Sequence, residues 1–244
     1  MTQIELKLCF RNFIYVFFAF VFPPMMLLLF GAMYGNEPSQ YTGGVGTVDF
    51  STPAYIGMLI AVSGIMGLPI ALSEYRSRKV LKRYKATPVG KLTILAPQLI
   101  VNALICILGL TLLIIVGVIV FDLKFHGGLI GVFYFIIAFI LSLGAIFSIG
   151  FLIAATAPNS QSAMAISFAL YFVMLFLSGA TVPLSIMPKA ITIISKGLPL
   201  TYCVELLQGV WLGGAIWEFW IPIVILSSIT IVCMVLSIKF FKWE

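Results

Sequence analysis

Six long apolar runs dominate this 244-residue chain. Each holds about 20 mostly apolar residues, the length that a helix needs to cross the roughly 30 Å hydrocarbon core of a bilayer. Only helices satisfy every backbone amide of an open segment in lipid, and the runs lack the alternation of β-barrel strands. The sequence therefore predicts an all-α integral membrane protein, one domain over residues 1–244. Its expected spans are about 13–34, 53–72, 93–121, 130–154, 163–182 and 219–239.

The composition supports a lipid environment. Hydrophobic residues make up 62% of the chain and charged residues only 9%, whereas about 25% is charged in an ordinary soluble domain. The net charge of +6 does not point to nucleic acid, because half of the 14 basic residues lie between Arg76 and Lys91, a segment flanked by apolar runs. A loop beside the membrane explains this cluster, and the lipid bilayer is the expected partner of the apolar surface.

The basic residues also predict the orientation of the chain. Loops rich in Lys and Arg stay on the cytoplasmic side of a membrane. With both termini inside, 11 basic residues are cytoplasmic and 3 are outside, so both ends of the chain are expected in the cytoplasm. The inner set is Lys7, Arg11, Arg76, Arg78, Lys79, Lys82, Arg83, Lys85, Lys91, Lys239 and Lys242, and the outer set is Lys124, Lys189 and Lys196.

Three outer segments follow from this orientation. Residues 35–52 are polar and glycine-rich, which predicts a flexible exposed loop. Residues 122–129 predict a tight turn in which Asp122 and Lys124 form a surface pair and His126 is solvated. Residues 183–218 are cut by Pro and Gly into pieces of about ten residues, which predicts short re-entrant or interfacial helices before the last span.

The inner segment Ser73–Lys91 carries most of the positive charge. Residues Glu74 to Lys85 can form a short helix with an apolar side and a basic side, and Pro88 ends it because proline disfavours helical geometry in the residue before it. One interpretation is an anchor that only fixes the orientation. The other is a docking helix for a cytosolic partner.

This segment resembles the first cytoplasmic loop of the ABC-2 type permeases, the membrane subunits of a class of ATP-binding-cassette exporters. The shared run is E-x-R-x-x-x-x-L-K-R-x-x-A-T-P-V, from Glu74 to Val89. Two later runs, Ser178 to Pro188 and Leu198 to Gly209, are similar to the outer segment before the last span of that family. An amphipathic start, Met1–Asn12, and a short inner loop, residues 157–162, also fit.

The resemblance implies a six-helix exporter half of the type V fold, similar to the short bacterial permeases of antibiotic-resistance exporters. Two halves, as a homodimer or a heterodimer, would form the pathway in a bacterial plasma membrane, each docked on a cytosolic ATPase through the inner loop. The residues that would couple the permease to the ATPase are Glu74, Arg76, Val80, Leu81, Lys82, Arg83, Tyr84, Lys85, Thr87 and Pro88.

The chain lacks the phosphate-binding loop G-x-x-x-x-G-K-[ST] of many ATPases. We therefore expect ATP to be used by a separate subunit, with no cofactor bound by this chain. The sequence shows no metal-ligand spacing and no nucleophile, base or paired carboxylate at membrane depth, so we expect no catalytic or metal-binding residues. The chain is predicted not to be an enzyme by itself.

A few side chains are candidates for the substrate path or a gate. Polar groups on the third span are expected to face the interior, where they either meet substrate or only join helices. Aromatic residues on the fifth span would line an apolar cavity between two protomers or face lipid. A carboxyl group in the outer segment would gate the exit or contact substrate, or only face water. The candidates are Gln98, Asn102, Phe168, Phe172, Phe176 and Glu205.

The leading functional hypothesis is an ATP-driven exporter subunit for an apolar or amphipathic substrate such as a lipid, a lipid-linked precursor or an amphipathic antibiotic. An ion-coupled carrier or channel that acts alone is the first alternative. It is disfavoured because such carriers place ionisable residues in their spans, and the predicted spans hold almost none. A membrane immunity protein that binds a ligand without transporting it is the second alternative.

Overall fold

The protein is an all-α integral membrane protein. The computed structural model describes residues 2–38, 44–77, 91–182, 184 and 187–240, and no β-strand occurs among them. In chain order the elements are α1 (Thr2–Arg11), α2 (Phe13–Val16), η1 (Phe17–Val21), α3 (Phe22–Tyr34), α4 (Thr47–Ala61), η3 (Val62–Gly67), α5 (Leu68–Ser77), α7 (Lys91–Phe121), α8 (Gly128–Thr156), α9 (Ser160–Leu177), α10 (Lys189–Ser195), α11 (Pro199–Trp211), η5 (Ile216–Phe219) and α12 (Trp220–Phe240).

Six stretches of helix are long and apolar enough to cross a bilayer, which confirms the six predicted spans. In order, spans 1 to 6 are Phe13–Tyr34, Thr47–Ser77, Ala96–Phe121, Gly128–Thr156, Ser160–Leu177 and Ile216–Phe240. The predicted short helices before the last span correspond to α10 and α11, which are bent by 93° relative to each other.

Three span boundaries differ from the prediction by five or six residues, and one of them is the end of span 2, which lies at Ser77 instead of residue 72. Span 2 begins at Thr47 instead of residue 53, so the supposed flexible loop already contains the first turns of a helix. Span 5 ends at Leu177 instead of residue 182, because Gly179 adopts a φ of +86°, a left-handed geometry that stops the helix.

Spans 1 and 2 each contain a π-helical segment, η1 and η3, and prolines follow both. A proline has no N–H for the carbonyl four residues earlier, and its ring clashes with that carbonyl. Pro23 and Pro24 would leave the carbonyls of Ala19 and Phe20 without a partner, and both of these residues lie in η1. Pro69 does the same for Ile65 in η3. The wider turns themselves are closed by the Phe22 N–H on the Phe17 carbonyl and by the Leu68 N–H on the Ser63 carbonyl, and π turns occur often at functional sites.

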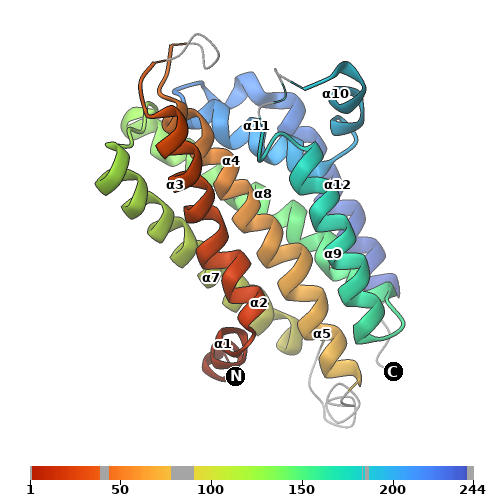
Figure 1. Cartoon of the computed structure of the whole chain (residues 1–244). Coiled ribbons are helices and arrows are strands. Elements are labelled where there is room, and N and C mark those ends of the chain that lie inside the picture. The colour runs from red at the N-terminus through yellow and green to blue at the C-terminus, as the bar shows by residue number, and fades with distance from the viewer. Residues whose placement is uncertain (1, 39–43, 78–90, 183, 185–186, 241–244) are drawn as a thin grey trace.

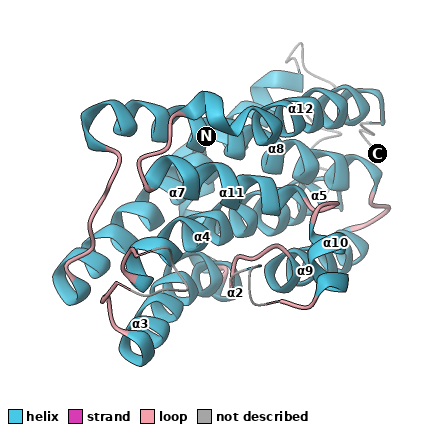
Figure 2. Cartoon of the chain, turned by 90° about the horizontal axis from the view of Figure 1, so that it is seen from above, coloured by secondary structure: helices cyan, strands magenta, loops and turns pink. Residues whose placement is uncertain are grey.

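Span 2 is the central helix of the bundle. In its most apolar stretch 83% of the residues are buried, against 17–56% for the other spans. Seen from above, α4 lies between α3 and α9 on one side and α8 and α12 on the other (Figure 2). Every other span therefore keeps a broad face for lipid or for a partner, whereas span 2 contacts protein almost all round.

Glycines allow span 2 to approach its neighbours. A Cβ on Gly150 of α8 would collide with the carbonyl oxygen of Gly64 in η3, and a Cβ on Gly64 would lie 2.7 Å from Ile146. A Cβ on Gly57 would lie 3.1 Å from Val204 of α11. Small residues at such crossings let the backbones pack closely in a membrane.

The two ends of the bundle differ. One end, which we call the α1 end, holds α1, the end of α5 and the end of α12, and the other, which we call the α11 end, holds α10 and α11 (Figure 1). At the α1 end the chain turns from α1 into span 1 at Asn12, whose extended backbone separates the two helices and whose Oδ1 accepts a hydrogen bond from the Tyr15 N–H at 3.2 Å.

Candidate functional site

A cavity of about 430 Å³ lies at the α1 end of the bundle, between span 1, the second half of span 2 and α9. Residues from α1 and the turn after it also line it. The lining residues are Cys9, Arg11, Asn12, Ile14, Tyr15, Met66, Gly67, Ile70, Ala71, Glu74, Tyr75, Met164 and Phe168. Its size lies within the range of small-molecule sites in proteins.

The cavity wall divides into polar and apolar parts. Arg11, Asn12, Glu74 and Tyr75 supply polar groups from the ends of α1 and α5, whereas the side chains from η3, the start of α5 and α9 are mostly apolar. The Arg11 guanidinium makes no hydrogen bond or ion pair with the described part of the chain. A pocket with apolar walls and a few polar groups fits a molecule that has an apolar body and a polar end.

A hydrogen bond between Tyr15 and Asn102 fixes the part of the cavity wall that Tyr15 forms. The Tyr15 hydroxyl donates to Oδ1 of Asn102 on α7 at 2.8 Å, and the Asn102 amide donates to the Gln98 carbonyl at 2.8 Å. A Cβ on Gly67 would lie 2.5 Å from Asn102 Oδ1 and 2.7 Å from the Tyr15 ring, so glycine at this position lets span 2 approach the pair. The pair joins spans 1 and 3, and span 2 packs against it at Gly67.

Gln98 and Asn102 are both 1% exposed, and neither lines the cavity. Of their two predicted roles, the structure shows the helix-joining one for Asn102. Asn102 acts on the cavity only through Tyr15, whose own side chain lines it. Contact of Gln98 or Asn102 with a substrate stays a prediction.

Three phenylalanines form a ladder along α9. The rings of Phe168 and Phe172 stack with centroids 6.3 Å apart, and those of Phe172 and Phe176 repeat this distance. Phe18 of η1 meets Phe172 edge to face at 6.1 Å. Phe168 lines the cavity, while Phe172 and Phe176 are 37% and 59% exposed, so an aromatic track leads from the cavity along the outer face of α9.

The proposed coupling residues are described only at the start of their segment, because Val80 to Pro88 lie outside the described residues. Glu74 is exposed and lines the cavity. The Arg76 guanidinium donates to the carbonyls of Ala154, at 3.2 Å, and Ala157, where α8 ends. A cation there satisfies free helix carbonyls and complements the helix dipole. Arg76 thus fastens the end of span 2 to the turn between α8 and α9.

Glu205 is not near the cavity. It lies on α11, at the opposite end of the bundle, and its side chain is exposed (Figure 1). Partial burial raises the pKa of the Glu205 carboxyl above its ordinary value. The cavity therefore brings together Phe168 and Glu74 from the predicted sets, while Glu205 lies at a separate location.

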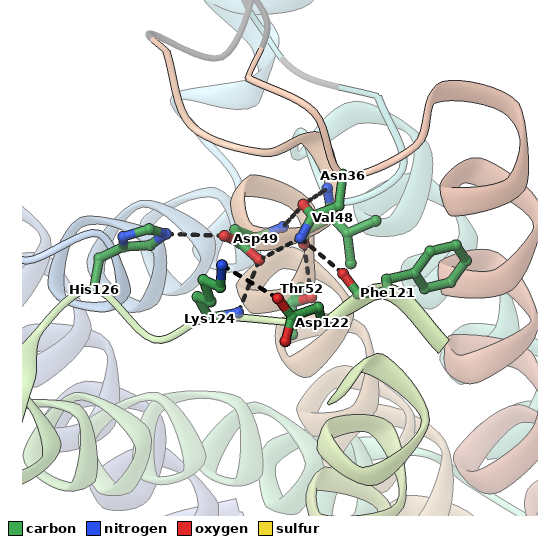
Figure 3. Close-up of polar contacts among 8 residues, drawn as sticks. All are labelled: Asn36, Val48, Asp49, Thr52, Phe121, Asp122, Lys124 and His126. Carbon is green, nitrogen blue, oxygen red and sulfur yellow. Dashed lines mark hydrogen bonds and ion pairs between the residues drawn. The ribbon is translucent and has the colours of Figure 1, made fainter. Parts of the chain in front are cut away.

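A polar cluster at the α11 end was not predicted from the sequence: His126 is exposed, as expected for a solvated residue, but its ring also contacts a buried carboxylate. Figure 3 shows that His126 Nε2 points at Asp49 of α4 and lies 2.9 Å from Oδ2, while the backbone N–H of Lys124 donates to Asp49 Oδ1 at 3.0 Å. The Asp49 carboxylate is almost completely buried, with 4% of its side chain exposed. The predicted pair of Asp122 and Lys124 is confirmed as an exposed contact of 3.2 Å.

Asn36 completes this cluster. Its Oδ1 accepts hydrogen bonds from the N–H groups of Val48 and Asp49 at 3.1 and 3.2 Å, which caps the start of α4. Its amide donates to Asp49 Oδ1 at 3.0 Å and to the Phe121 carbonyl at the end of α7 at 3.1 Å. The sequence signal was a carboxylate three residues after Gly46, which is typical of the first turn of a helix.

The fold and the cavity define a multi-pass helical membrane protein with a cavity at one end. The family model described as ABC-2 type transporter matches residues 1–212. The chain therefore belongs to the ABC-2 type transporter family, whose members are membrane components of transporters and normally work with an ABC ATPase. The comparison with curated proteins finds no match.

Proposed function

We propose that this chain is the membrane-spanning subunit of an ATP-driven exporter that moves an apolar or amphipathic molecule outward, with two permease copies and separate ATPase subunits in a bacterial plasma membrane. The observation that carries the proposal is the cavity at the α1 end, which combines apolar walls with polar groups from α1 and α5. Membership of the ABC-2 family supports a transport role.

The distribution of charge supports an inward-facing α1 end. Lys7 and Arg11 of α1, Arg76 of α5 and Lys239 of α12 all belong to elements that end there, and basic residues remain on the cytoplasmic side. The cavity then opens at the level of the inner leaflet, where an amphipathic molecule can enter from lipid or from the cytosol. An epitope tag inserted after Lys82 should be inaccessible from outside intact cells, whereas a tag in residues 39–43 should be accessible.

Coupling is proposed to run through the segment from Glu74 to Lys85. Its first part is the end of span 2, and Arg76 fixes this end to the turn between α8 and α9. A push from a closing ATPase on this segment would therefore reach span 2 and α8 together. Span 2 lines the cavity directly. α8 does not line it but packs closely against η3 of span 2.

The proposal is tested by reconstituting the chain with its ATPase subunit in proteoliposomes. Two probes separate the substrate classes: NBD-labelled phosphatidylglycerol represents a lipid, and rhodamine 6G represents an amphipathic drug. Movement of either probe only with hydrolysable ATP supports the exporter. Movement that needs neither ATP nor the ATPase would indicate a carrier or channel, and binding of a probe without movement would indicate a ligand-binding protein.

A further inference from the structure

The polar cluster at the α11 end, formed around Asn36, Asp49 and His126, joins four parts of the chain. Asn36 follows α3, Asp49 lies in the first turn of α4, and Lys124 and His126 belong to the turn between α7 and α8 (Figure 3). The backbone N–H of His126 also donates to the Trp211 carbonyl at the end of α11, at 3.1 Å. One buried carboxylate thus organises the outer ends of spans 1 to 4 and the end of α11.

Every polar atom at the centre of the cluster has a partner. Asp49 Oδ1 accepts from Asn36 and Lys124, and Oδ2 contacts His126. Among the described residues with less than a tenth of their surface exposed, Asp49 is the only one with an ionisable carboxyl group. Separation of these elements would strip a buried carboxylate of its partners, which is much more costly than breaking an exposed ion pair.

Further contacts tie α11 to the same region. The Gln208 amide of α11 donates to the Phe50 carbonyl of α4 at 2.8 Å, and a Cβ on Gly213 would lie 3.0 Å from the His126 carbonyl. By contrast, the hydrogen bonds of Asn36, Asp49, Lys124 and His126 described above do not reach α9, and α11 packs much more extensively against α4 and α8 than against α9. The elements at the α11 end are therefore tied more strongly to one another than to α9, which exposes Phe176.

We propose that Asp49 and His126 are positioning residues that hold the α11 end of spans 1 to 4 and α11 together as a rigid cap throughout transport, so that substrate leaves on the α9 side of α4. This inference rests on the proposed function. In this proposal the α11 end does not move during transport. The elements that move are α9 and the halves of spans 1 and 2 nearer the α1 end, where η1 and η3 lie.

The test replaces the hydrogen bonds by a covalent link. Glu37 and Lys124 are exposed neighbours of the cluster, because Asn36 and the Lys124 N–H donate to the same oxygen of Asp49. In a Glu37→Cys, Lys124→Cys variant, a short bis-methanethiosulfonate links the two positions and dithiothreitol removes the link. The single-cysteine variants, treated in the same way, control for reaction at the four native cysteines. Transport of NBD-phosphatidylglycerol and rhodamine 6G and ATP hydrolysis are measured together in the reconstituted complex.

If the cap stays closed, the linked protein exports at the rate of the unlinked one. Asp49→Asn should lower export per ATP hydrolysed by about tenfold, and the 37–124 link should restore most of this loss, which a general folding defect would not allow. Asp122→Asn is the matched control, because its exposed carboxylate lies on the same turn and, within the described part of the chain, forms an ion pair with Lys124 alone. It should export normally.

Two results would overturn the inference: a link that blocks export until dithiothreitol is added, or an Asp49→Asn variant that exports like the wild type. The wild-type complex separates this failure from failure of the proposed function. If it moves neither probe with ATP, the exporter itself is refuted. If it moves a probe but the variants behave in these ways, only the rigid cap is refuted.

Discussion

Gly150 shows how a single residue determines the packing of the two central helices. Its Cα lies so close to the carbonyl of Gly64 that no side chain fits between them, and the contact joins α8 to the π segment of span 2. A backbone carbonyl cannot move aside as the end of a flexible side chain can. Even one methyl group must therefore separate the helices.

We expect Gly150→Ala to destabilise the folded protein by about 1–3 kcal/mol, the usual cost of overpacking. Thermal unfolding of the purified protein in lipid nanodiscs measures this. Gly144→Ala on the same helix is the control, because its Cβ would meet Thr230 at 3.6 Å, an ordinary contact, and it should change little. Equal stability of the two variants would show that α8 and span 2 are not in close contact.

Glu205 provides a prediction of pH dependence. Its pKa is raised by partial burial, so the carboxyl becomes neutral at a higher pH than an ordinary glutamate does. If the charged form serves export, export should fall as the outer pH drops through this raised value. Glu205→Gln, which mimics the neutral form, should give low export at every pH while assembly stays intact.

Transport by proteoliposomes at a series of outer pH values tests this prediction. Glu218→Gln, a change to an exposed carboxylate of η5, should retain the wild-type profile. Normal export by Glu205→Gln would remove Glu205 from the path and leave it as a surface residue.

At the scale of elements, most spans were predictable because a run of about 20 apolar residues has one low-energy solution in lipid. The start of span 2 was not predictable, because its polar residues Thr47, Asp49 and Ser51 suggested a loop. Asn36 and His126 satisfy the carboxylate of Asp49 from distant parts of the sequence. Only the folded chain brings these partners together, so a hydropathy pattern cannot reveal them.

The candidate site was predictable only in part for the same reason. The aromatic spacing of α9 identified Phe168, which lines the cavity, but Tyr15 and Met66 belong to two other spans and carry no local signal. Asn102 was singled out as a polar residue in an apolar span, and its partner Tyr15 was not. Prolines 23, 24 and 69 were visible, yet the π segments before them depend on how each helix accommodates the missing hydrogen bond.

The basic inner segment is an element whose role is tested by charge reversal. We expect Lys82→Glu with Arg83→Glu to leave the permease folded and to lower export strongly while ATP is still hydrolysed, because the ATPase then no longer pushes on span 2. Lys239→Glu on α12 is the control, since it removes a cation from the same end of the bundle outside this segment. The ratio of export to ATP hydrolysis is the measurement, and an unchanged ratio would contradict a coupling role.

Over the molecule as a whole, the two ends of the bundle differ. The α11 end holds the cluster around Asp49, and the α1 end holds the cavity and Arg76. Span 2 connects them, fixed at its start by Asp49 and at its end by Arg76. A central helix held at both ends can transmit a movement made at the α1 end along the bundle.

A substitution that fills the cavity tests most directly whether the substrate enters there. Ala71 lines it from α5, and Ala71→Trp should occupy much of the space, whereas Ala96→Trp adds the same side chain to an exposed position on α7. In proteoliposomes with the ATPase subunit, ATP-dependent movement of the exported probe should be lost with Ala71→Trp and retained with Ala96→Trp, at equal amounts of complex. Wild-type export by the Ala71→Trp variant would contradict the assignment of this cavity as the place where the substrate enters.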